Sequence, residues 1–296
     1  MEKIKFTKMV GAGNDFIVLD CRQATIRQLV VAGFSPRYMH NLKVATTIVR
    51  QLCDRKTGIG ADGVLVLEKS KIADFRMRIF NADGSVAEMC GNGLRCAVLF
   101  TGKKKIKVET KAGIYDGEIT ARNRVKIRME NPKDLKQDFS IKVNLRDLKV
   151  NYINTGVPHV VIFVEGLDKI NVNAIGRTIR YHKEFAPKGA NVNFVEIVDD
   201  SNIKIRTYER GVEGETLACG TGSAASAIIT GLKASLGFAR DMQGFPHYGS
   251  EQARLKVNVH TQGGVLKVEF TKSRNKVKNV CLDGEAKEIF TGQITL

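Results

Sequence analysis

The chain has 296 residues, of which 43% are hydrophobic and 26% are charged, a composition typical of a globular protein with one large domain or two of about 150 residues. No apolar run approaches the ~20 residues of a membrane-spanning helix, and no apolar signal region precedes the first alternating strand pattern, so we expect a cytoplasmic protein without a membrane partner. The 47 basic and 31 acidic residues give a net charge of +16, which we interpret as a basic surface without a nucleic-acid partner, because no nucleic-acid-binding motif accompanies it.

The predicted elements of the first half are short strands with few helices. Residues 3–20 alternate as a strand interrupted by Gly11-Ala-Gly-Asn-Asp15, in which Asn14 is an ordinary turn residue. Helical spacing follows toward residue 53, behind an insertion near 22–47 that we assign no role. Further strands are expected at 64–68, 75–81, 105–110, 113–120 and 124–130.

Cys90 lies where a predicted strand turns and opens a helix, in Met89-Cys-Gly-Asn-Gly-Leu-Arg-Cys96. The glycines leave backbone N–H groups uncovered, and the residues that follow are typical of a buried helix. A thiol at such an N-terminus meets unpaired N–H donors and the positive end of the helix dipole, and both favour the thiolate. The same N–H groups can bind a carboxylate, so we predict a base beside an anion site.

A second glycine-flanked cysteine, Cys219, repeats this pattern in the other half of the chain. The stretch Ala218-Cys-Gly-Thr-Gly222 again precedes a helix that we expect to be buried, here rich in alanine and serine. Two copies of Cys-Gly-x-Gly, one in each half, indicate an internal duplication. Copies that face each other would supply two thiols to one pocket.

The second half also consists of short strands, expected at 150–155, 159–165, 192–198, 202–210, 253–260, 265–270 and 276–282. A second insertion, near 239–252, has no assigned role. We interpret Asn131-Pro-Lys133 and the polar residues after it as the linker between the halves. Many short strands around one buried helix, twice over, predict an α+β protein of two similar domains and not a βαβ alternation.

Two residues of the second half have both a structural and a functional interpretation. Glu209 falls on the same face of its predicted strand as Ile203, so its carboxylate either belongs to a buried ion pair with Arg210 or serves a site. His159, after Gly156-Val-Pro158, is either a satisfied strand-end histidine or a site residue. The residues alone leave both alternatives open.

The six cysteines do not predict a disulfide framework in a chain of this size. Because the sequence has no Cys-x-x-Cys and no matched Cys/His pair, we also expect no structural metal site. Four cysteines stand outside the glycine-flanked helix starts and are expected to be small buried hydrophobic residues: Cys21, Cys53, Cys96 and Cys281.

Together these motifs resemble those of the diaminopimelate epimerase family. The resemblance rests on Arg78-Ile-Phe-Asn-Ala-Asp-Gly-Ser85, on the segment 89–96 around Cys90 and on the segment 206–222 that ends in the second cysteine motif. It extends over essentially the whole chain, including segments 8–16, 53–63 and 284–296. It implies an isomerase, an epimerase that needs no cofactor and interconverts LL- and meso-diaminopimelate on the path to lysine and peptidoglycan.

The resemblance also implies an architecture of two similar domains, each a curled, mostly antiparallel sheet around a central helix, with the active site in the cleft. By analogy with the family, the C-terminal strand returns to the first domain. The domains are then residues 1–130 with 283–296, and residues 131–282. A small-molecule substrate is the implied partner, neither cofactor nor metal is implied, and the oligomeric state, including a homodimer, stays open.

Matching by motif assigns implied roles to individual residues. Cys90 and Cys219 resemble the acid–base pair, and His159 and Glu209 resemble the residues that assist it beside the substrate. The amide donors for the carboxylate at the reacting centre correspond to Gly91, Asn92, Gly220 and Thr221. The pocket for the distal amino-acid end corresponds to Asn14, Asn81, Asn191 and Arg210. Val157 departs from the pattern, since many members have Asn between this glycine and proline.

Two thiols suit this chemistry because inversion at Cα needs a proton removed from one face and another delivered to the opposite face. A single base would tend to return the proton to the side from which it came. One thiolate and one thiol on opposite sides exchange roles with the direction of reaction. The developing carbanion needs amide donors fixed on its carboxylate.

Three alternatives are set against this interpretation. Proline racemase and hydroxyproline epimerase share the paired thiols, but they typically have His where this chain has Asn92 and lack the Glu209-Arg210 pair. A basic nucleic-acid-binding protein with structural cysteines would show steep salt-dependent binding. A thiol redox protein would usually have a resolving cysteine, and the separation of Cys90 from Cys219 does not match such a pair.

Overall fold

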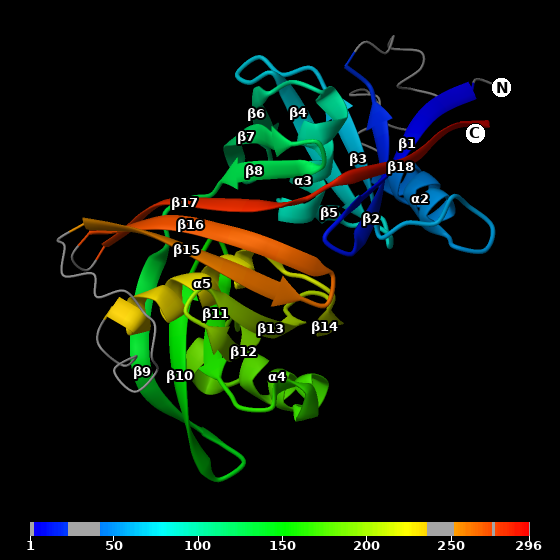
Figure 1. Ribbon diagram of the computed structural model, residues 1–296. Coiled ribbons are helices and arrows are strands. Elements are labelled where there is room, and N and C mark those ends of the chain that lie inside the picture. Colours follow the sequence, from blue (N-terminus) through cyan, green and yellow to red (C-terminus); the bar gives the residue numbers. More distant parts are fainter. Residues whose placement is uncertain (1–2, 23–41, 236–251, 274–275, 296) are drawn as a thin grey trace. The chain divides into compact units, whose positions relative to one another are not determined.

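The computed structural model describes residues 3–22, 42–235, 252–273 and 276–295, and the predicted insertions near 22–47 and 239–252 lie largely outside these ranges. The chain divides into two compact units, Met1–Ile127 with Gly284–Leu296, and Arg128–Asp283. Each unit is a curled, mostly antiparallel sheet around one helix, which confirms the predicted fold class (Figure 1).

The first unit contains two helices and nine strands within the described residues. The helices are α2 (Leu42–Cys53) and α3 (Gly91–Thr101). The strands are β1 (Lys3–Gly11), β2 (Asn14–Asp20), β3 (Gly63–Glu68), β4 (Phe75–Asn81), β5 (Val86–Ala87), β6 (Lys105–Thr110), β7 (Gly113–Ala121), β8 (Arg124–Arg128) and β18 (Lys287–Thr295). Their order is β18-β1-β2-β3-β4-β6-β7-β8 with β5 beside β4, and only the pairs β2–β3 and β4–β6 are parallel.

The second unit has the same kinds of elements. Its helices are α4 (Val172–Arg180) and α5 (Gly220–Ser235), with short 3-10 turns at Leu167–Lys169 and Lys183–Phe185. Its strands are β9 (Lys133–Val143), β10 (Arg146–Asn154), β11 (Pro158–Phe163), β12 (Asn191–Asp199), β13 (Asn202–Glu209), β14 (Gly214–Thr216), β15 (Gln252–Thr261), β16 (Gly264–Ser273) and β17 (Lys276–Glu285). Their order is β9-β10-β11-β12-β13-β15-β16-β17 with β14 beside β13.

The two sheets share one connectivity, strand for strand. In the second unit the parallel pairs are β11–β12 and β13–β15, at the same places in the order as in the first. The central helix follows the short strand in both units, α3 after β5 and α5 after β14. This repetition agrees with the internal duplication inferred from the two cysteine motifs.

Each central helix is buried because its own sheet curls around it. The helix α3 contacts β1, β2, β3, β4, β7 and β18, and α5 contacts β10, β11, β12, β13, β15 and β16. Leu94, Ala97 and Val98 of α3 are fully buried in the core that results. The helix ends at Gly102, whose φ of 67° is the left-handed conformation that glycine adopts without strain. A second helix in each unit, α2 or α4, packs on the other face of the sheet.

Where the central helix meets its sheet, one residue is large and the other is small, and the two units place the large residue on opposite sides of this contact. In the first unit a Cβ on Gly117 of β7 would lie 2.6 Å from Val98 Cγ2, so glycine lets the strand approach the helix. The hairpins of the two units correspond, because Thr110 Oγ1 donates to the Gly113 carbonyl and Thr261 Oγ1 to the Gly264 carbonyl. Val268 therefore follows Gly264 by four residues, as Gly117 follows Gly113. Ala227 follows Cys219 by eight residues, as Val98 follows Cys90, and both Ala227 and Val268 are buried.

Two predictions about the second unit were wrong or incomplete. The polar residues after Asn131-Pro132 were expected to be a linker, but they form β9. In β9 every second residue from Phe139 to Val143 is apolar and packs into the same hydrophobic core as α4: Phe139, Ile141 and Val143. The charged residues in the first half of the strand hid this alternation in the sequence. The helix α4 was not predicted, although Asn171 caps it by accepting from the Ala174 N–H at 3.0 Å.

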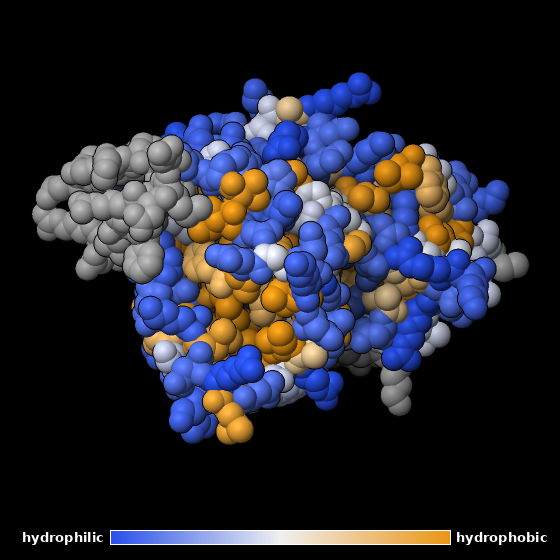
Figure 2. Space-filling model, turned by 60° about the horizontal axis from the view of Figure 1, so that its bottom comes forward, coloured by the Kyte–Doolittle hydropathy of each residue, from blue (hydrophilic) through white to orange (hydrophobic). Residues whose placement is uncertain are grey.

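Figure 2 shows a face on which hydrophilic residues predominate and some hydrophobic residues reach the surface. Exposed large apolar side chains of the described ranges include Leu145, Val212 and Ile72. Single exposed apolar residues are ordinary on protein surfaces. None of the described helices combines the length and the apolar character that crossing a bilayer requires.

Gly117→Ala tests the close approach of β7 to α3. The added methyl group would collide with Val98, so we expect the free energy of unfolding to fall by about 1–3 kcal/mol. Val98→Ala should also destabilise, by leaving a cavity. The double variant should lose less than the sum of the two, because each change relieves the other. Urea unfolding of the four proteins measures this, and strictly additive losses would contradict the contact.

Candidate active site

Cys90 is the N-cap of α3. Its backbone is extended, with φ −143° and ψ 116°, and its Sγ accepts the Gly93 N–H at 3.5 Å. Its carbonyl accepts the Leu94 N–H at 2.8 Å and begins the helical hydrogen-bond pattern. The thiol therefore occupies the place that a serine or aspartate oxygen usually takes at a helix start. The N–H groups of Gly91 and Asn92 belong to the first turn, where helix geometry provides no acceptor.

Two asparagines and an arginine support this helix start. Asn92 is buried, its Nδ2 donates to Asn14 Oδ1 at 2.6 Å, and its Oδ1 accepts from Arg95 Nη2 at 2.6 Å. Arg95 has no exposed surface, although it stands in an otherwise apolar helix. Because a guanidinium can only donate, the amide orientation of Asn92 is determined, and with it that of Asn14.

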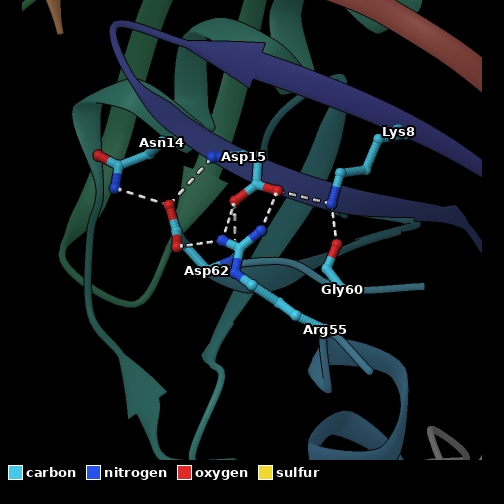
Figure 3. Close-up of polar contacts among 6 residues, drawn as sticks. All are labelled: Lys8, Asn14, Asp15, Arg55, Gly60 and Asp62. Atoms are coloured by element: carbon cyan, nitrogen blue, oxygen red, sulfur yellow. Dashed lines mark hydrogen bonds and ion pairs between the residues drawn. The ribbon is translucent and has the colours of Figure 1, made fainter. Parts of the chain in front are cut away.

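Asn14 is in turn held by a cluster of charged groups, which we call the Asp15 cluster: Lys8, Asn14, Asp15, Arg55, Gly60 and Asp62 (Figure 3). Asn14 Nδ2 donates to Asp62 Oδ2 at 3.1 Å. Arg55 Nη2 bridges the two carboxylates, at 2.7 Å from Asp15 Oδ1 and 2.8 Å from Asp62 Oδ1. Lys8 is buried, and its Nζ lies 2.7 Å from Asp15 Oδ2 and contacts the Gly60 carbonyl.

The charges of the cluster determine the ionisation of Asp15. Its partial burial alone would raise the pKa of the carboxyl group. The hydrogen bonds and positive charges of Arg55 and Lys8 outweigh that effect and hold the pKa far below its usual value. Asp15 therefore stays ionised throughout the pH range in which the protein works, and the turn between β1 and β2 is held by an ion pair.

Asn81 lies at the end of β4 in the same unit. Its Nδ2 donates to Ser85 Oγ at 2.9 Å, and its backbone closes the turn that leads to β5, with Asn81 N donating to the Ser85 carbonyl at 2.9 Å. The side chain is exposed. It is thus positioned by its turn and still reachable by solvent.

Cys219 repeats the cap in the second unit. Its Sγ accepts the Gly222 N–H at 3.4 Å and lies 3.4 Å from Thr221 Oγ1. Its carbonyl accepts the Ser223 N–H at 2.8 Å. Thr155 holds the loop from the other side, because its Oγ1 donates to the Thr221 carbonyl at 2.9 Å. Gly220 and Thr221 thus stand where Gly91 and Asn92 stand in the first unit.

His159 is fully buried at the start of β11. Its Nδ1 lies 3.1 Å from Asn193 Nδ2 on the neighbouring strand β12. Burial and, secondly, the positive charge of Arg210 lower its pKa to about 3, so the imidazole is neutral at physiological pH. The pKa of Glu209, at the end of β13, is shifted upward, because burial raises it. The Thr216 hydroxyl donates to Glu209 Oε2 at 3.0 Å and lowers the pKa by a smaller amount.

Arg210 and Asn191 are joined through the backbone. The Arg210 N–H donates to Asn191 Oδ1 at 2.7 Å, and Asn191 Nδ2 donates to the Pro158 carbonyl at 3.3 Å. Asn191 therefore ties the start of β11 to the end of β13. Within the described residues the Arg210 guanidinium forms no ion pair, in contrast to Arg180 and Arg206 of the same unit. Val157 is half-buried in the turn before β11.

The predicted site residues thus form two groups. Asn14, Cys90, Gly91 and Asn92 gather in the first unit around the start of α3, and Asn81 lies at the end of β4 in the turn to β5. The second unit holds the remainder around the start of α5 and the ends of β11, β12 and β13: His159, Asn191, Glu209, Arg210, Cys219, Gly220 and Thr221. The described residues contain no cluster of three or more His, Cys, Asp or Glu side chains that could hold a metal ion.

The other four cysteines differ from the capping pair. Cys53 and Cys96 are buried, as expected, whereas Cys21 and Cys281 are half-buried. Burial raises the pKa of Cys96 to about 12 and those of Cys21 and Cys53 to about 11. The raised pKa values favour the protonated thiol in Cys21, Cys53 and Cys96 at physiological pH.

Several residues that hold the site were not singled out from the sequence: Lys8, Asp62, Arg95, Thr155 and Asn193. Arg95 and Asn193 carried a signal, because each is a polar residue inside a run of apolar ones that the fold buries. Lys8 and Asp62 carried none, since a lysine in an alternating strand and an aspartate in a glycine-rich turn are ordinary.

Comparison with known proteins agrees with these features. The sequence profile of the family described as diaminopimelate epimerase matches residues 6–135 and 151–288. A diaminopimelate epimerase of Aquifex aeolicus (strain VF5) is 39% identical over 302 residues, which cover 99% of this chain and 98% of the relative. One from Hydrogenobaculum sp. (strain Y04AAS1) is 46% identical over 242 residues, with 77% and 84% covered. Among solved structures, a Bacillus anthracis phenazine biosynthesis protein of the PhzF family has the same fold, with a TM-score of 0.67 at 20% identity over the full length of both chains.

Asp15→Asn tests the Asp15 cluster through its pH dependence. The variant leaves the Lys8 ammonium without its carboxylate, so we expect the free energy of unfolding at pH 7 to fall by roughly 3 kcal/mol. Because the folded-state pKa of Asp15 is depressed, its contribution is present above the unfolded value near 4 and is lost as the pH falls below it. The difference from the parent protein should therefore shrink below about pH 4.

The control is Asp116→Asn, which removes an exposed carboxylate from β7 of the same unit. It should change stability by less than about 0.5 kcal/mol at every pH. Urea unfolding at several pH values measures both variants. A loss for Asp15→Asn that stays constant down to pH 2 would contradict the depressed pKa.

Proposed function

This chain belongs to the diaminopimelate epimerase family, and from that premise we propose that it interconverts LL- and meso-diaminopimelate with Cys90 and Cys219 as the paired acid and base. The enzyme is an isomerase of lysine biosynthesis. The observation that carries the proposal is the matched thiol cap, one at the start of each central helix, with Sγ accepting the third N–H of the helix in both.

The position of each thiol suits a group that alternates between acid and base. A thiolate at a helix start is favoured by the helix dipole and by the N–H group that it accepts. A thiol has an ordinary pKa of about 8.5, so a modest shift brings it close to the working pH. One cysteine removes the Cα proton from one face of the substrate as thiolate, and the other delivers a proton to the opposite face as thiol.

The developing carbanion needs stabilisation at its carboxylate. The first-turn N–H groups beside each thiol are suited to this because the N-terminus of a helix directs its N–H groups and the positive end of its dipole at an anion. They belong to Gly91 and Asn92 in the first unit and to Gly220 and Thr221 in the second. The hydrogen bonds from Arg95 to Asn92 and from Thr155 to Thr221 hold the two loops in place. Preorganised donors avoid the cost of reorganisation during the reaction.

Glu209 and His159 assist the thiols in this proposal, and both have environments that favour the neutral form. Burial raises the pKa of Glu209, which suits a carboxyl group that exchanges a proton with its surroundings. His159 is neutral because its pKa is lowered to about 3. His159 therefore adds no fixed charge that would hold one thiol in one protonation state.

The distal amino-acid end of the substrate is assigned to Asn14, Asn81, Asn191 and Arg210. The Arg210 guanidinium suits the distal carboxylate, because Arg binds carboxylates through two parallel hydrogen bonds and the described residues give it no ion pair. We place the enzyme in the cytoplasm, which its six free cysteines support. The substrate is the partner in this proposal, and the oligomeric state, including a homodimer, stays open.

Deuterium exchange in single-thiol variants tests the acid–base pair. Cys90→Ala and Cys219→Ala should each lose roughly 10²–10⁴-fold in epimerisation, because one face then has no proton donor or acceptor. In deuterated water each variant should still exchange the Cα proton that faces its remaining thiol. One variant should thus label LL-diaminopimelate at an L centre without inverting it, and the other should label the meso isomer only at its D centre.

The control is Cys21→Ala, which removes a half-buried thiol whose pKa is raised to about 11. It should retain parental turnover without added cofactor or metal. Isomer ratios by chiral chromatography and label by mass spectrometry give both readouts. Exchange at the same centre in both cysteine variants would refute a two-face mechanism.

Arg210→Lys tests the distal carboxylate. An ammonium cannot form the two parallel hydrogen bonds, so KM for diaminopimelate should rise roughly tenfold or more, while thermal stability stays near that of the parent. Arg177→Lys, an exposed change on α4, is the matched control. Unchanged kinetics in Arg210→Lys would assign Arg210 a structural role.

Val157→Asn introduces the asparagine of many family members and should lower KM if that contact reaches the substrate.

A further inference from the structure

His159 has one defined hydrogen-bond partner, the side-chain amide of Asn193. Asn193 Nδ2 lies 3.1 Å from His159 Nδ1 and 3.0 Å from the carbonyl oxygen of Val160. Asn193 and His159 are both fully buried, on the adjacent parallel strands β12 and β11. The contact is therefore shielded from water and fixed by the register of the sheet.

The orientation of the Asn193 amide follows from its neighbours. The Val160 carbonyl can only accept, so the NH2 group and not the oxygen of Asn193 faces it and His159. On its other side Asn193 Oδ1 accepts from Thr207 Oγ1 at 3.0 Å, on β13. The two hydrogens of Nδ2 are thus directed at the Val160 carbonyl and at His159 Nδ1.

The orientation of the amide determines where His159 carries its proton. A ring nitrogen that accepts a hydrogen bond from an amide N–H uses its lone pair for that bond and therefore bears no hydrogen. His159 is neutral, since burial and the charge of Arg210 lower its pKa to about 3, so it carries a single ring proton. That proton is on Nε2, which is buried and has no hydrogen-bond partner within the described residues.

The start of α5 is built around the same amide. A Cβ on Gly222 would lie 2.3 Å from Asn193 Oδ1 and 3.3 Å from Cys219 Cβ. Glycine at position 222 therefore makes room for Asn193 beside the Cys219 loop. The loop that presents the thiol and the amide that orients His159 occupy adjoining space.

We propose that Asn193 is a positioning residue that holds His159 as the Nε2–H tautomer, so that His159 serves the reaction as a hydrogen-bond donor to an anion and not as a proton acceptor. The proposal rests on the proposed function for the place of His159 in the reaction. It deepens that function, because a neutral donor stabilises a thiolate or a carboxylate without adding charge or competing for the proton that the thiols exchange.

The first test observes the tautomer directly in the intact protein. Nitrogen chemical shifts of protein with isotope-labelled histidine distinguish a protonated from an unprotonated ring nitrogen. His159→Gln identifies the signal among those of the five histidines. We expect Nδ1 unprotonated and Nε2 protonated at neutral pH. A proton on Nδ1 of the parent protein would overturn the proposal, whatever the enzyme's activity.

The second test changes the partner of Nδ1. Asn193→Asp places an acceptor at Nδ1 and should move the ring proton to Nδ1. The loss in kcat/KM should be on the order of 100-fold. A loss confined to kcat identifies the anion as a thiolate, and a rise in KM identifies it as the substrate carboxylate. Asn193→Ala, which adds no buried charge, should give mixed tautomers and a smaller loss.

The matched control is Asn151→Asp. Asn151 is buried on β10, and its Nδ2 donates to the Val161 carbonyl at 3.2 Å, next to the carbonyl that Asn193 contacts. It does not contact His159, so its change should lower stability but leave the tautomer and KM as they are. Equal kinetic losses in Asn151→Asp and Asn193→Asp would overturn the positioning role. An enzyme with the expected tautomer that does not epimerise diaminopimelate would instead refute the proposed function.

Discussion

Each half of this enzyme encloses a helix inside its own sheet, and an enclosed helix must satisfy the donors of its first turn. The first N–H groups of an α-helix have no acceptor within the helix itself. In this chain the sulfur atoms of Cys90 and Cys219 serve as acceptors at the helix starts, and each accepts the third N–H of its helix. In the mechanism that we propose, the group that caps each helix is also the acid or base of the reaction.

Buried asparagines extend this arrangement outward from the caps. Asn92, Asn191 and Asn193 each have an amide whose orientation is determined by a partner that can only donate or only accept: Arg95, the Arg210 N–H and the Val160 carbonyl. Amides oriented in this way act as fixed dipoles in a poorly hydrated interior. The consequence is that the polar groups around each cap are set in advance, and preorganised groups of this kind are the ones that stabilise developing charge most effectively.

The sequence predicted most of this fold, and the exceptions have physical causes. Strands β4 and β6 begin and end at the predicted residues, because their apolar and polar residues alternate over most of their length. Strands β5 and β14 have two and three residues, too few to show a period. Strand β9 was hidden by its charged residues, and α4 was missed despite the cap at Asn171. At the site, the glycine-flanked cysteines were readable as helix starts, whereas the Asn193–His159 contact depends on the register of β11 and β12, which no local pattern encodes.

Strand β18 pairs with β1 from Lys3 opposite Thr295 to Val10 opposite Lys287, so the first unit is completed by the last residues of the chain. During synthesis the ribosome makes residues 1–127 and then the entire second unit before this strand exists. Throughout that interval β1, with its buried apolar side chains Phe6 and Met9, is an open sheet edge. Domains usually fold in the order in which they are made. Here the first unit stays incomplete until β18 has been made, and until then the edge of β1 is open to pairing with other chains.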